Sequence, residues 1–365
     1  MKVAIITSYN SNNPAGLERV LLEQLRAFTK INGKDGVEYL IYSNQSCDLE
    51  QVLEKEKISL PVVKIGFGKL WREIGLFFAP KADAYFFNGP LVPVFFVPKN
   101  YFVLVYDFAY RYFTNNSPKQ RIKSAWTDFV SALAFRRAKK IVAISNATGD
   151  EICKFFKVNR DNVVTIYLGW TAINQLPSEQ VFGLPEKYFM FIGTLKERKN
   201  VLSVIHAFAL FREKKKGDKK LVIVGKRNEN STYIHKINEF IEKHQLEKEV
   251  FFTGHITDNQ VAYIYSHAEI LVFPSLLEGF GMPLLEAMSF GVPVITSNVS
   301  SLYEVAGHAA LLVEPKNIEQ IALAMEKITT DLNFRKNLID RGYERIKYFS
   351  WDKAAFEYDN LFKKG

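Results

Sequence analysis

The sequence lacks the features that mark several common classes of protein. It has two cysteines, Cys47 and Cys153, which cannot form a CxxC metal or redox motif and point to a reducing compartment. No run of about 18 apolar residues is present, so a membrane-spanning helix is not expected. Internal repeats and low-complexity tracts are absent as well. With 48% hydrophobic residues, 20 glycines and 13 prolines, the composition excludes a disordered, collagen-like or small disulfide-stapled chain.

Several motifs of known chemistry are also missing. There is no GxGxxG and no acidic residue after a second strand, which argues against a nicotinamide or flavin domain. GxxxxGK[ST] and GxSxG are absent, which argues against a P-loop nucleoside triphosphatase and a serine hydrolase of that design. No D-x-D pair exists, and the six histidines show no metal-ligand spacing. We therefore expect no metal site.

The chain is long enough for roughly two domains, and its net charge of +9 is shared unevenly between its halves. Residues 1–170 contain 23 lysines and arginines against 15 acidic residues, whereas residues 171–365 contain 25 against 24. Aromatic residues gather in the same basic half, between Phe67 and Phe113. A basic and aromatic face is suited to binding an anionic membrane surface, an anionic acceptor or nucleic acid. The alternative is that the positive charge serves only to keep the protein soluble.

Short apolar runs alternate with longer amphipathic ones, which predicts parallel sheets covered by helices on both faces. In the first half we expect strands at Val3–Thr7, Glu38–Ser43, Ala84–Asn88, Tyr101–Tyr106 and Lys140–Ser145, and helices at Gly16–Lys30, Lys119–Arg137 and Ala147–Phe156. In the second half we expect strands at Tyr188–Gly193, Leu221–Gly225, Glu249–Gly254, Glu269–Pro274, Pro293–Ser297 and Ala310–Pro315.

The two strand series are separated by an irregular stretch. Residues 171–187 have no clear period and contain two prolines, so we interpret them as a linker. An amphipathic helix is expected over residues 351–365, after a turn at Ser350. The predicted fold is α/β, with two doubly wound, Rossmann-like domains at residues 1–170 and 188–350 that face each other across a cleft.

The segment SLLEGFGMPLLEAM follows an expected strand, where open α/β sheets bind their ligands. Gly279 and Gly281 let a ligand approach the backbone, and Pro283 suits the first turn of a helix whose free N–H groups attract a phosphate. Glu278 and Glu286, the latter expected in that first turn, would repel a phosphate and are better placed to bind sugar or ribose hydroxyls. A strand–turn–helix with a capping glutamate is the alternative.

A second candidate segment, FIGTLKERKN, ends another strand and puts Lys196, Arg198 and Lys199 before a helix expected at Val201–Phe211. Cations at this turn can reach a diphosphate, which Arg binds through two parallel hydrogen bonds and Lys through its single ammonium charge. The alternative is that this charged segment is an ordinary solvent-exposed loop. Gly225 ends a third strand and would also admit a ligand.

The runs FIGTLKERKN, LVIVGKR, FFTGHIT and LEGFGMPLLEAM, in this order and at these intervals, resemble the second domain of family 4 glycosyltransferases. These are GT-B enzymes that use nucleotide sugars. The resemblance covers most of Tyr188–Trp351, and VAIIT…GLERV, VYDFAY and IVAISNAT match the family's order in the first half. FSWDKAA resembles the closing segment, where the last helix crosses back onto the first domain.

The resemblance also implies roles for individual residues. The family's E-x7-E motif falls on Glu278 and Glu286, so Glu278 would contact the transferred sugar and Glu286 the ribose hydroxyls. Lys199 and Arg198 would hold the diphosphate, and Asp107 of VYD would join the catalytic residues. The other donor-binding positions that it implies are Gly16, Thr194, Gly225, His255, Ile256, Gly279, Phe280, Gly281, Met282 and Pro283.

Two positions depart from the family's pattern. Thr194 stands where many members have Arg after the first-strand glycine, and Arg198 would supply that charge. Tyr106 stands where many members have His before the Asp of VYD. Because that His usually touches the donor sugar, the sugar preference stays open.

The function that the resemblance implies is retaining transfer of a hexose, of the mannose or glucose type, from GDP-mannose or a UDP-hexose. The acceptor would be a growing glycan or a lipid-linked molecule bound by the first domain. Cations and backbone N–H groups would stabilise the departing diphosphate without a metal or other cofactor. The family retains the anomeric configuration by front-face attack, so no carboxylate nucleophile is needed.

We expect a cytoplasmic protein that docks on the inner face of the cell membrane. The basic helix expected within Lys119–Lys140 carries Trp126, Phe129 and Phe135 and is the candidate docking surface, with ordinary packing as the alternative.

Three other functions remain open. A nucleotide-sugar epimerase of similar fold would act without an acceptor, and a non-catalytic protein would bind the nucleotide without turnover. A nucleic-acid binder would explain the basic half. However, the aromatic residues between Phe67 and Phe113 lie mostly in apolar runs, as in a core, rather than at base-facing positions. We therefore expect no nucleic-acid partner.

Overall fold

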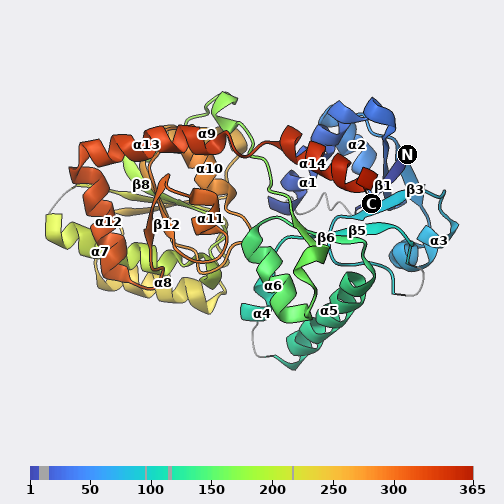
Figure 1. Cartoon of the computed structure of the whole chain (residues 1–365). Coiled ribbons are helices and arrows are strands. Elements are labelled where there is room, and N and C mark those ends of the chain that lie inside the picture. The colour runs from blue at the N-terminus through green and yellow to red at the C-terminus, as the bar shows by residue number, and fades with distance from the viewer. Residues whose placement is uncertain (8–15, 95–96, 114–116, 216–217, 365) are drawn as a thin grey trace. The chain divides into compact units, whose positions relative to one another are not determined.

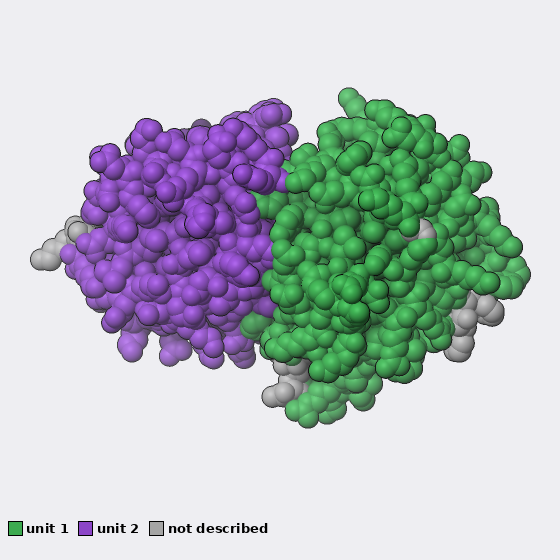
Figure 2. Space-filling view, viewed as in Figure 1, with its two compact units in different colours: residues 1–169, 349–365 green, residues 170–348 purple. Residues whose placement is uncertain are grey.

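The chain folds into two compact units, each built on one parallel sheet (Figure 1). The computed structural model describes residues 1–7, 16–94, 97–113, 117–215 and 218–364. Unit 1 comprises residues 1–169 and 349–365, and unit 2 comprises residues 170–348 (Figure 2).

Unit 1 contains a seven-stranded sheet in the order β3-β2-β1-β4-β5-β6-β7, in which every pair of neighbours is parallel. Five strands lie where the apolar runs predict them. The edge strands β3 and β7 were not expected, because they are only four and three residues long and most of their side chains are partly exposed. The strands are β1 (Lys2–Ile6), β2 (Glu38–Asn44), β3 (Val62–Ile65), β4 (Ala84–Phe87), β5 (Tyr101–Val105), β6 (Lys140–Ala143) and β7 (Val163–Thr165).

Helices cover both faces of this sheet. Two of them begin at capping serines, since Ser117 accepts a hydrogen bond from the Gln120 N–H and Ser145 from the Thr148 N–H. The helices are α1 (Gly16–Ile31), α2 (Leu49–Lys55), α3 (Leu76–Phe78), α4 (Ala109–Tyr112), α5 (Pro118–Arg137), α6 (Asn146–Phe156) and α14 (Trp351–Lys364), with short turns η1 (Lys34–Gly36), η2 (Gly68–Leu70), η3 (Trp71–Gly75) and η4 (Arg160–Asn162).

The C-terminal helix α14 completes unit 1 by packing against α1 (Figure 1). Alternate residues of a strand face opposite sides of its sheet, so Phe86 points to α1 and α14 while Phe87 points to the core under α5 and α6. Phe362 of α14 is fully buried against Phe86. The Tyr39 hydroxyl donates to Asp359 of α14 at 2.6 Å, and the helix is thereby fixed to the sheet.

Unit 2 repeats the strand order of the first six strands of unit 1, with the sheet order β10-β9-β8-β11-β12-β13 and parallel pairing throughout. All six strands were expected from the sequence. They are β8 (Tyr188–Ile192), β9 (Leu221–Val224), β10 (Val250–Gly254), β11 (Ala268–Phe273), β12 (Val294–Ser297) and β13 (Ala310–Val313). The helices are α7 (Val201–Lys215), α8 (Thr232–Lys243), α9 (Asp258–His267), α10 (Met282–Ser289), α11 (Leu302–Ala306), α12 (Ile318–Thr330) and α13 (Leu332–Ile346), with turns η5 (Ile173–Gln175) and η6 (Glu197–Lys199).

The segment interpreted as a linker, residues 171–187, makes specific contacts with unit 2. Asn174 donates a side-chain hydrogen bond to the Ser289 carbonyl at 3.2 Å. Glu179 accepts hydrogen bonds from the side chains of Thr257 and Gln260 at the start of α9. This irregular stretch is therefore attached to the second sheet domain. None of the helices in the described part of the chain has the length and apolarity that a membrane crossing requires.

The packing of α14 gives a first prediction. Phe362→Ala removes a buried ring and should destabilise unit 1 by about 3–5 kcal/mol. Phe356→Ala, on the exposed side of the same helix, should change the stability by less than about 0.5 kcal/mol. Urea unfolding followed by circular dichroism measures both variants. Equal effects of the two substitutions would contradict the described packing.

Candidate functional site

The two chemistry-bearing segments of unit 2 meet at one end of its sheet. β8 and β11 are paired in parallel, so their carboxyl ends lie side by side. From β8 the chain proceeds through β9 to β10 on one side, and β11 starts the other side of the sheet. This reversal of strand order is the topological switch point, where open α/β sheets bind ligands. The loop after β8 carries Arg198 and Lys199, and the loop after β11 carries Glu278.

A group of three charges, two buried and one partly buried, joins these loops. The Lys199 ammonium lies 2.5 Å from Oε1 of Glu278, and Arg198 Nη1 lies 3.3 Å from Oε2 of the same carboxylate. The side chains of Lys199 and Glu278 are 11% and 9% exposed. Arg198 also donates to the Leu277 carbonyl at 3.2 Å. The structure therefore brings together the two candidate segments of the sequence analysis, Arg198 and Lys199 from one and Glu278 from the other.

Backbone anchors hold the loop that carries Glu278. The Ser300 hydroxyl donates to the Glu278 carbonyl at 2.6 Å and accepts from the Glu278 N–H at 3.2 Å. The Ser301 hydroxyl lies within hydrogen-bond distance of the carbonyls of Glu278 and Phe280. Gly281 has φ of 118°, and a Cβ there would lie 2.7 Å from a Leu302 methyl carbon. The loop thus requires glycine at this position.

Glu286 lies on α10, the helix that follows this loop. Contrary to the expectation of a first-turn position, it is the fifth residue of the helix and lies in the second turn, because α10 begins at Met282 directly after the left-handed Gly281. Its carboxylate is buried and accepts a hydrogen bond from the Tyr265 hydroxyl at 3.0 Å. Pro283 lies in the first turn, as expected.

The remaining unit 2 candidates lie at the carboxyl ends of neighbouring strands. Gly193 and Gly225 both have φ of 147°, and a Cβ on Gly225 would lie 2.0 Å from the Gly193 carbonyl oxygen. Thr194 is exposed after β8. His255 is exposed and Ile256 half-buried after β10, which β9 separates from β8.

The unit 1 candidates lie near a pocket of about 290 Å³ at the carboxyl ends of β1 and β4, its own switch point. The Tyr106 hydroxyl donates to Asn88, and burial raises the pKa of Tyr106, so this hydroxyl stays protonated. Asp107 accepts a hydrogen bond from the Ala109 N–H at 2.9 Å. Gly16 is exposed at the start of α1, and the loop before it lies outside the described residues. The pocket is lined by Ile6, Thr7, Leu17, Arg72, Phe87, Asn88, Gly89, Pro90, Leu91 and Tyr106.

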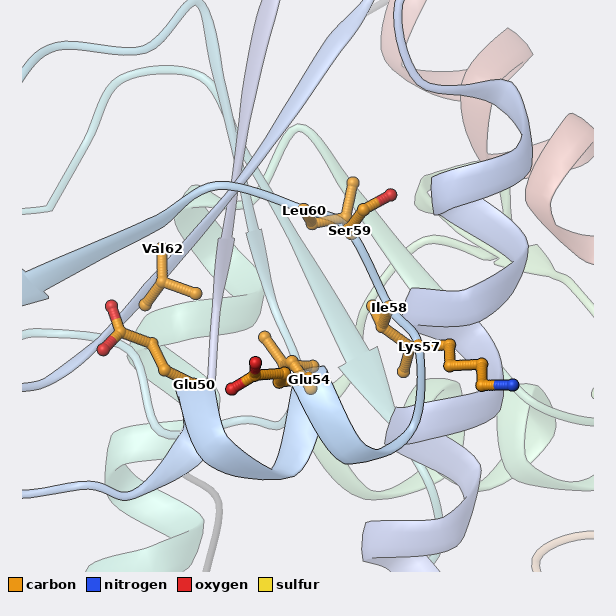
Figure 3. A pocket seen from close by; sticks show the side chains of 8 residues that line it. Glu50, Glu54, Lys57, Ile58, Ser59, Leu60 and Val62 are labelled. Carbon is orange, nitrogen blue, oxygen red and sulfur yellow. The ribbon is translucent and has the colours of Figure 1, made fainter.

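A second hollow in unit 1, of about 450 Å³, lies between α2 and the segment that leads into β3 (Figure 3). Glu50 and Glu54 of α2 line it, and Lys57 extends away from both carboxylates. Glu50 pairs with Lys64 at 2.5 Å. No candidate site residue lines this hollow. Within the described ranges, no three His, Cys, Asp or Glu side chains gather in a way that could hold a metal ion.

Comparison with known proteins identifies the class of the unit 2 domain. Residues 173–345 match the family model of the glycosyl transferases group 1. O-antigen chain mannosyltransferase B from Escherichia coli is 30% identical over 254 residues, which are 67% of this chain and 65% of that protein. Residues 173–345 thus form a domain of the glycosyl transferases group 1 type.

Two further comparisons define how far the likeness extends. Serotype-specific mannosyltransferase WbdA from Escherichia coli is 29% identical over 231 residues, which are 60% of this chain and 28% of that protein. The matches thus span less than two thirds of either mannosyltransferase. HepE from Anabaena, solved with UDP and glucose, aligns over 100% of this chain and 99% of its own, with a TM-score of 0.75 and 18% identity. This likeness confirms the predicted GT-B fold of two doubly wound domains.

Several residues of the group 1 domain and of unit 1 escaped the sequence analysis. Tyr265 precedes Glu286 by 21 residues, so nothing in their spacing links them. Ser300 and Ser301 follow β12, and a serine pair after a strand is the one signal that could have indicated them. Arg72 and Asn88 of the unit 1 pocket carry no motif.

The buried charge cluster of the group 1 domain gives a second prediction. Lys199→Ala leaves the buried Glu278 carboxylate with one cation fewer beside it, and Glu278→Ala leaves the Lys199 ammonium without its carboxylate partner. A double-mutant cycle should therefore give a coupling of about 1–3 kcal/mol. The exposed pair Lys336–Asp340 on α13, 2.9 Å apart, is the control and should give about 0.3–0.5 kcal/mol. Urea unfolding measures both cycles. Equal coupling in the two pairs would show that the cluster is not electrostatically special.

Proposed function

We propose that the protein is a retaining family 4 glycosyltransferase that moves a hexose from a nucleotide sugar to a glycan or lipid-linked acceptor. The observation that carries the proposal is the buried cluster of Lys199, Arg198 and Glu278 at the switch point of a group 1 domain. Two cations beside one carboxylate match a donor that has an anionic diphosphate next to a sugar bearing hydroxyl groups.

The donor diphosphate would bind to Lys199 and Arg198 by competing with Glu278 for them. Once the cations face the phosphates, the Glu278 carboxylate is free to accept a hydrogen bond from a hydroxyl of the transferred sugar. The N–H groups at the start of α10, beside Gly279 and Phe280, add positive potential to the same site. The cations and the helix end would stabilise the charge that develops on the leaving diphosphate without a metal.

Glu286 would hold the ribose hydroxyls of the donor. Its carboxylate already accepts from Tyr265, and a carboxylate has about four lone-pair sites, so it can accept further hydrogen bonds from the ribose. Tyr265 is therefore a positioning residue in this proposal. His255 and Ile256, at the end of β10, would lie toward the base.

Unit 1 would bind the acceptor in the pocket that contains Tyr106 and Asn88, with Asp107 adjacent. The names of the sequence relatives favour mannose as the transferred sugar, and the UDP and glucose bound to HepE make a UDP donor the second candidate. We propose a cytoplasmic location at the inner face of the membrane. Retention of configuration by front-face attack would need no carboxylate nucleophile.

A non-transferring nucleotide-sugar enzyme, such as an epimerase, is the competing function, because it would use the same donor contacts. Incubation with the donor alone and then with a glycan acceptor separates the two by product analysis. An altered sugar without acceptor identifies an epimerase, and a lengthened glycan identifies a transferase.

Donor binding gives a third prediction. In metal-free calorimetry with GDP, UDP and their sugar conjugates, Lys199→Ala and Glu286→Ala should weaken binding about tenfold or more, since hydrogen bonds to charged groups contribute about 1.5–3 kcal/mol. Lys196→Ala removes an exposed cation of the same loop and serves as the control, with binding unchanged. If Lys196→Ala weakens binding as much as Lys199→Ala, the buried cluster is not the diphosphate site.

A further inference from the structure

Helix α5 of unit 1 carries an apolar stripe that the fold leaves exposed. Ile122, Trp126 and Phe129 are 72%, 60% and 53% exposed. Their spacing of four and three residues aligns them along one side of the helix. The rings of Trp126 and Phe129 lie 5.8 Å apart, so they form one continuous surface.

The stripe is not needed for the core, because α5 packs through another side. Val130, Ala134 and Phe135 are buried on the sheet side of the helix. Phe135 was expected in the docking surface, but its ring lies edge-on to Phe156, 4.9 Å away. The sequence assignment was therefore wrong for Phe135, and the exposed stripe instead includes Ile122.

Basic residues border the stripe at both of its ends. Lys119 lies one turn before Ile122 and Arg136 two turns after Phe129, and both are exposed. The helix contains five lysines and arginines and a single acid, Asp128. That acid pairs with Arg111 at 2.8 Å, so it offsets little of the positive charge.

A second exposed apolar patch lies on the segment between β3 and β4. Phe67, Leu70, Phe77 and Phe78 are each more than half exposed, and the rings of Phe67 and Phe78 stack at 5.6 Å. Exposed Lys69 lies among them in sequence. This segment and α5 cover the same face of the unit 1 sheet, since both contribute to one core that includes Trp71 and Phe135, whereas α1 and α14 cover the opposite face (Figure 1).

We propose that the α5 stripe and the Phe67–Phe78 patch dock unit 1 on an anionic lipid bilayer. Large exposed apolar surfaces mark interaction sites, and Trp and Phe bordered by Lys and Arg match the acyl and headgroup layers of an anionic membrane. The excess of positive charge in residues 1–170 would draw the same unit to that surface over a longer range. Docking would bring the acceptor pocket of the proposed function to a lipid-linked substrate.

Co-sedimentation of the full chain with phosphatidylcholine vesicles, with and without phosphatidylglycerol, tests the docking surface. We expect binding to the anionic vesicles alone, weakened by high salt. Two double variants, Trp126→Ser with Phe129→Ser and Lys119→Glu with Lys123→Glu, should each lower the partition coefficient about tenfold or more. A third, Phe77→Ser with Phe78→Ser, should lower it as well.

Leu323→Ser with Leu332→Ser is the matched control, because it removes two exposed apolar side chains from unit 2 and should leave vesicle binding unchanged. Circular dichroism and nucleotide binding verify that each variant is folded. The measurement uses neither donor nor acceptor, so it is independent of the proposed transferase activity. Unchanged binding by the α5 variants overturns the proposal. It is also overturned if the wild-type chain ignores vesicles and sediments as a dimer that the α5 variants dissociate, since a second copy would then cover this surface.

Discussion

The ion pair between Lys199 and Glu278 is the interaction on which the organisation of unit 2 depends. Charges with this little exposure are tolerated only when paired, so the loops after β8 and β11 must meet at one point. That requirement explains the backbone devices around it. Ser300 and Ser301 tie down the carbonyls of the Glu278 loop, and the positive φ of Gly281 starts α10 directly behind that loop. A stable fold and a charged site are achieved by the same contacts.

In the proposed function, the pair also keeps the site ready for an anion. Lys199 is already largely desolvated, and both it and the partly exposed Arg198 are already positioned, so an incoming diphosphate need not order two long side chains from solvent. This advantage for binding is reduced because the two cations lose their contact with Glu278 when the diphosphate binds. A carboxylate released into a polar sugar pocket finds new donors there, whereas one released into an empty pocket does not. In the proposed function, the cluster therefore favours a ligand that carries both phosphate and hydroxyl groups over phosphate alone.

Sequence periodicity predicted the two sheet domains because buried parallel strands give continuous apolar runs. It missed β3 and β7 because edge strands of three or four residues give no such run. The position of Glu286 was wrong by one turn, since the start of α10 depends on the backbone of Gly281. The contact of Lys199 with Glu278 joins positions 79 residues apart, and only the adjacency of β8 and β11 brings it about.

The two units share a strand order but differ in where their charge and apolar surface lie. In unit 2 the acidic and basic residues nearly balance, so Lys199 and Arg198 act locally, within reach of hydrogen bonds. In unit 1 the excess of basic side chains extends over α5, beside exposed aromatic rings. The electrostatic field of such a spread of charge attracts a whole anionic surface rather than a single anionic group. If both proposals hold, one fold repeated twice thus presents a short-range anion site in one unit and a membrane-binding face in the other. The difference arises from side chains at strand ends and on one outer helix, since the sheets themselves are alike.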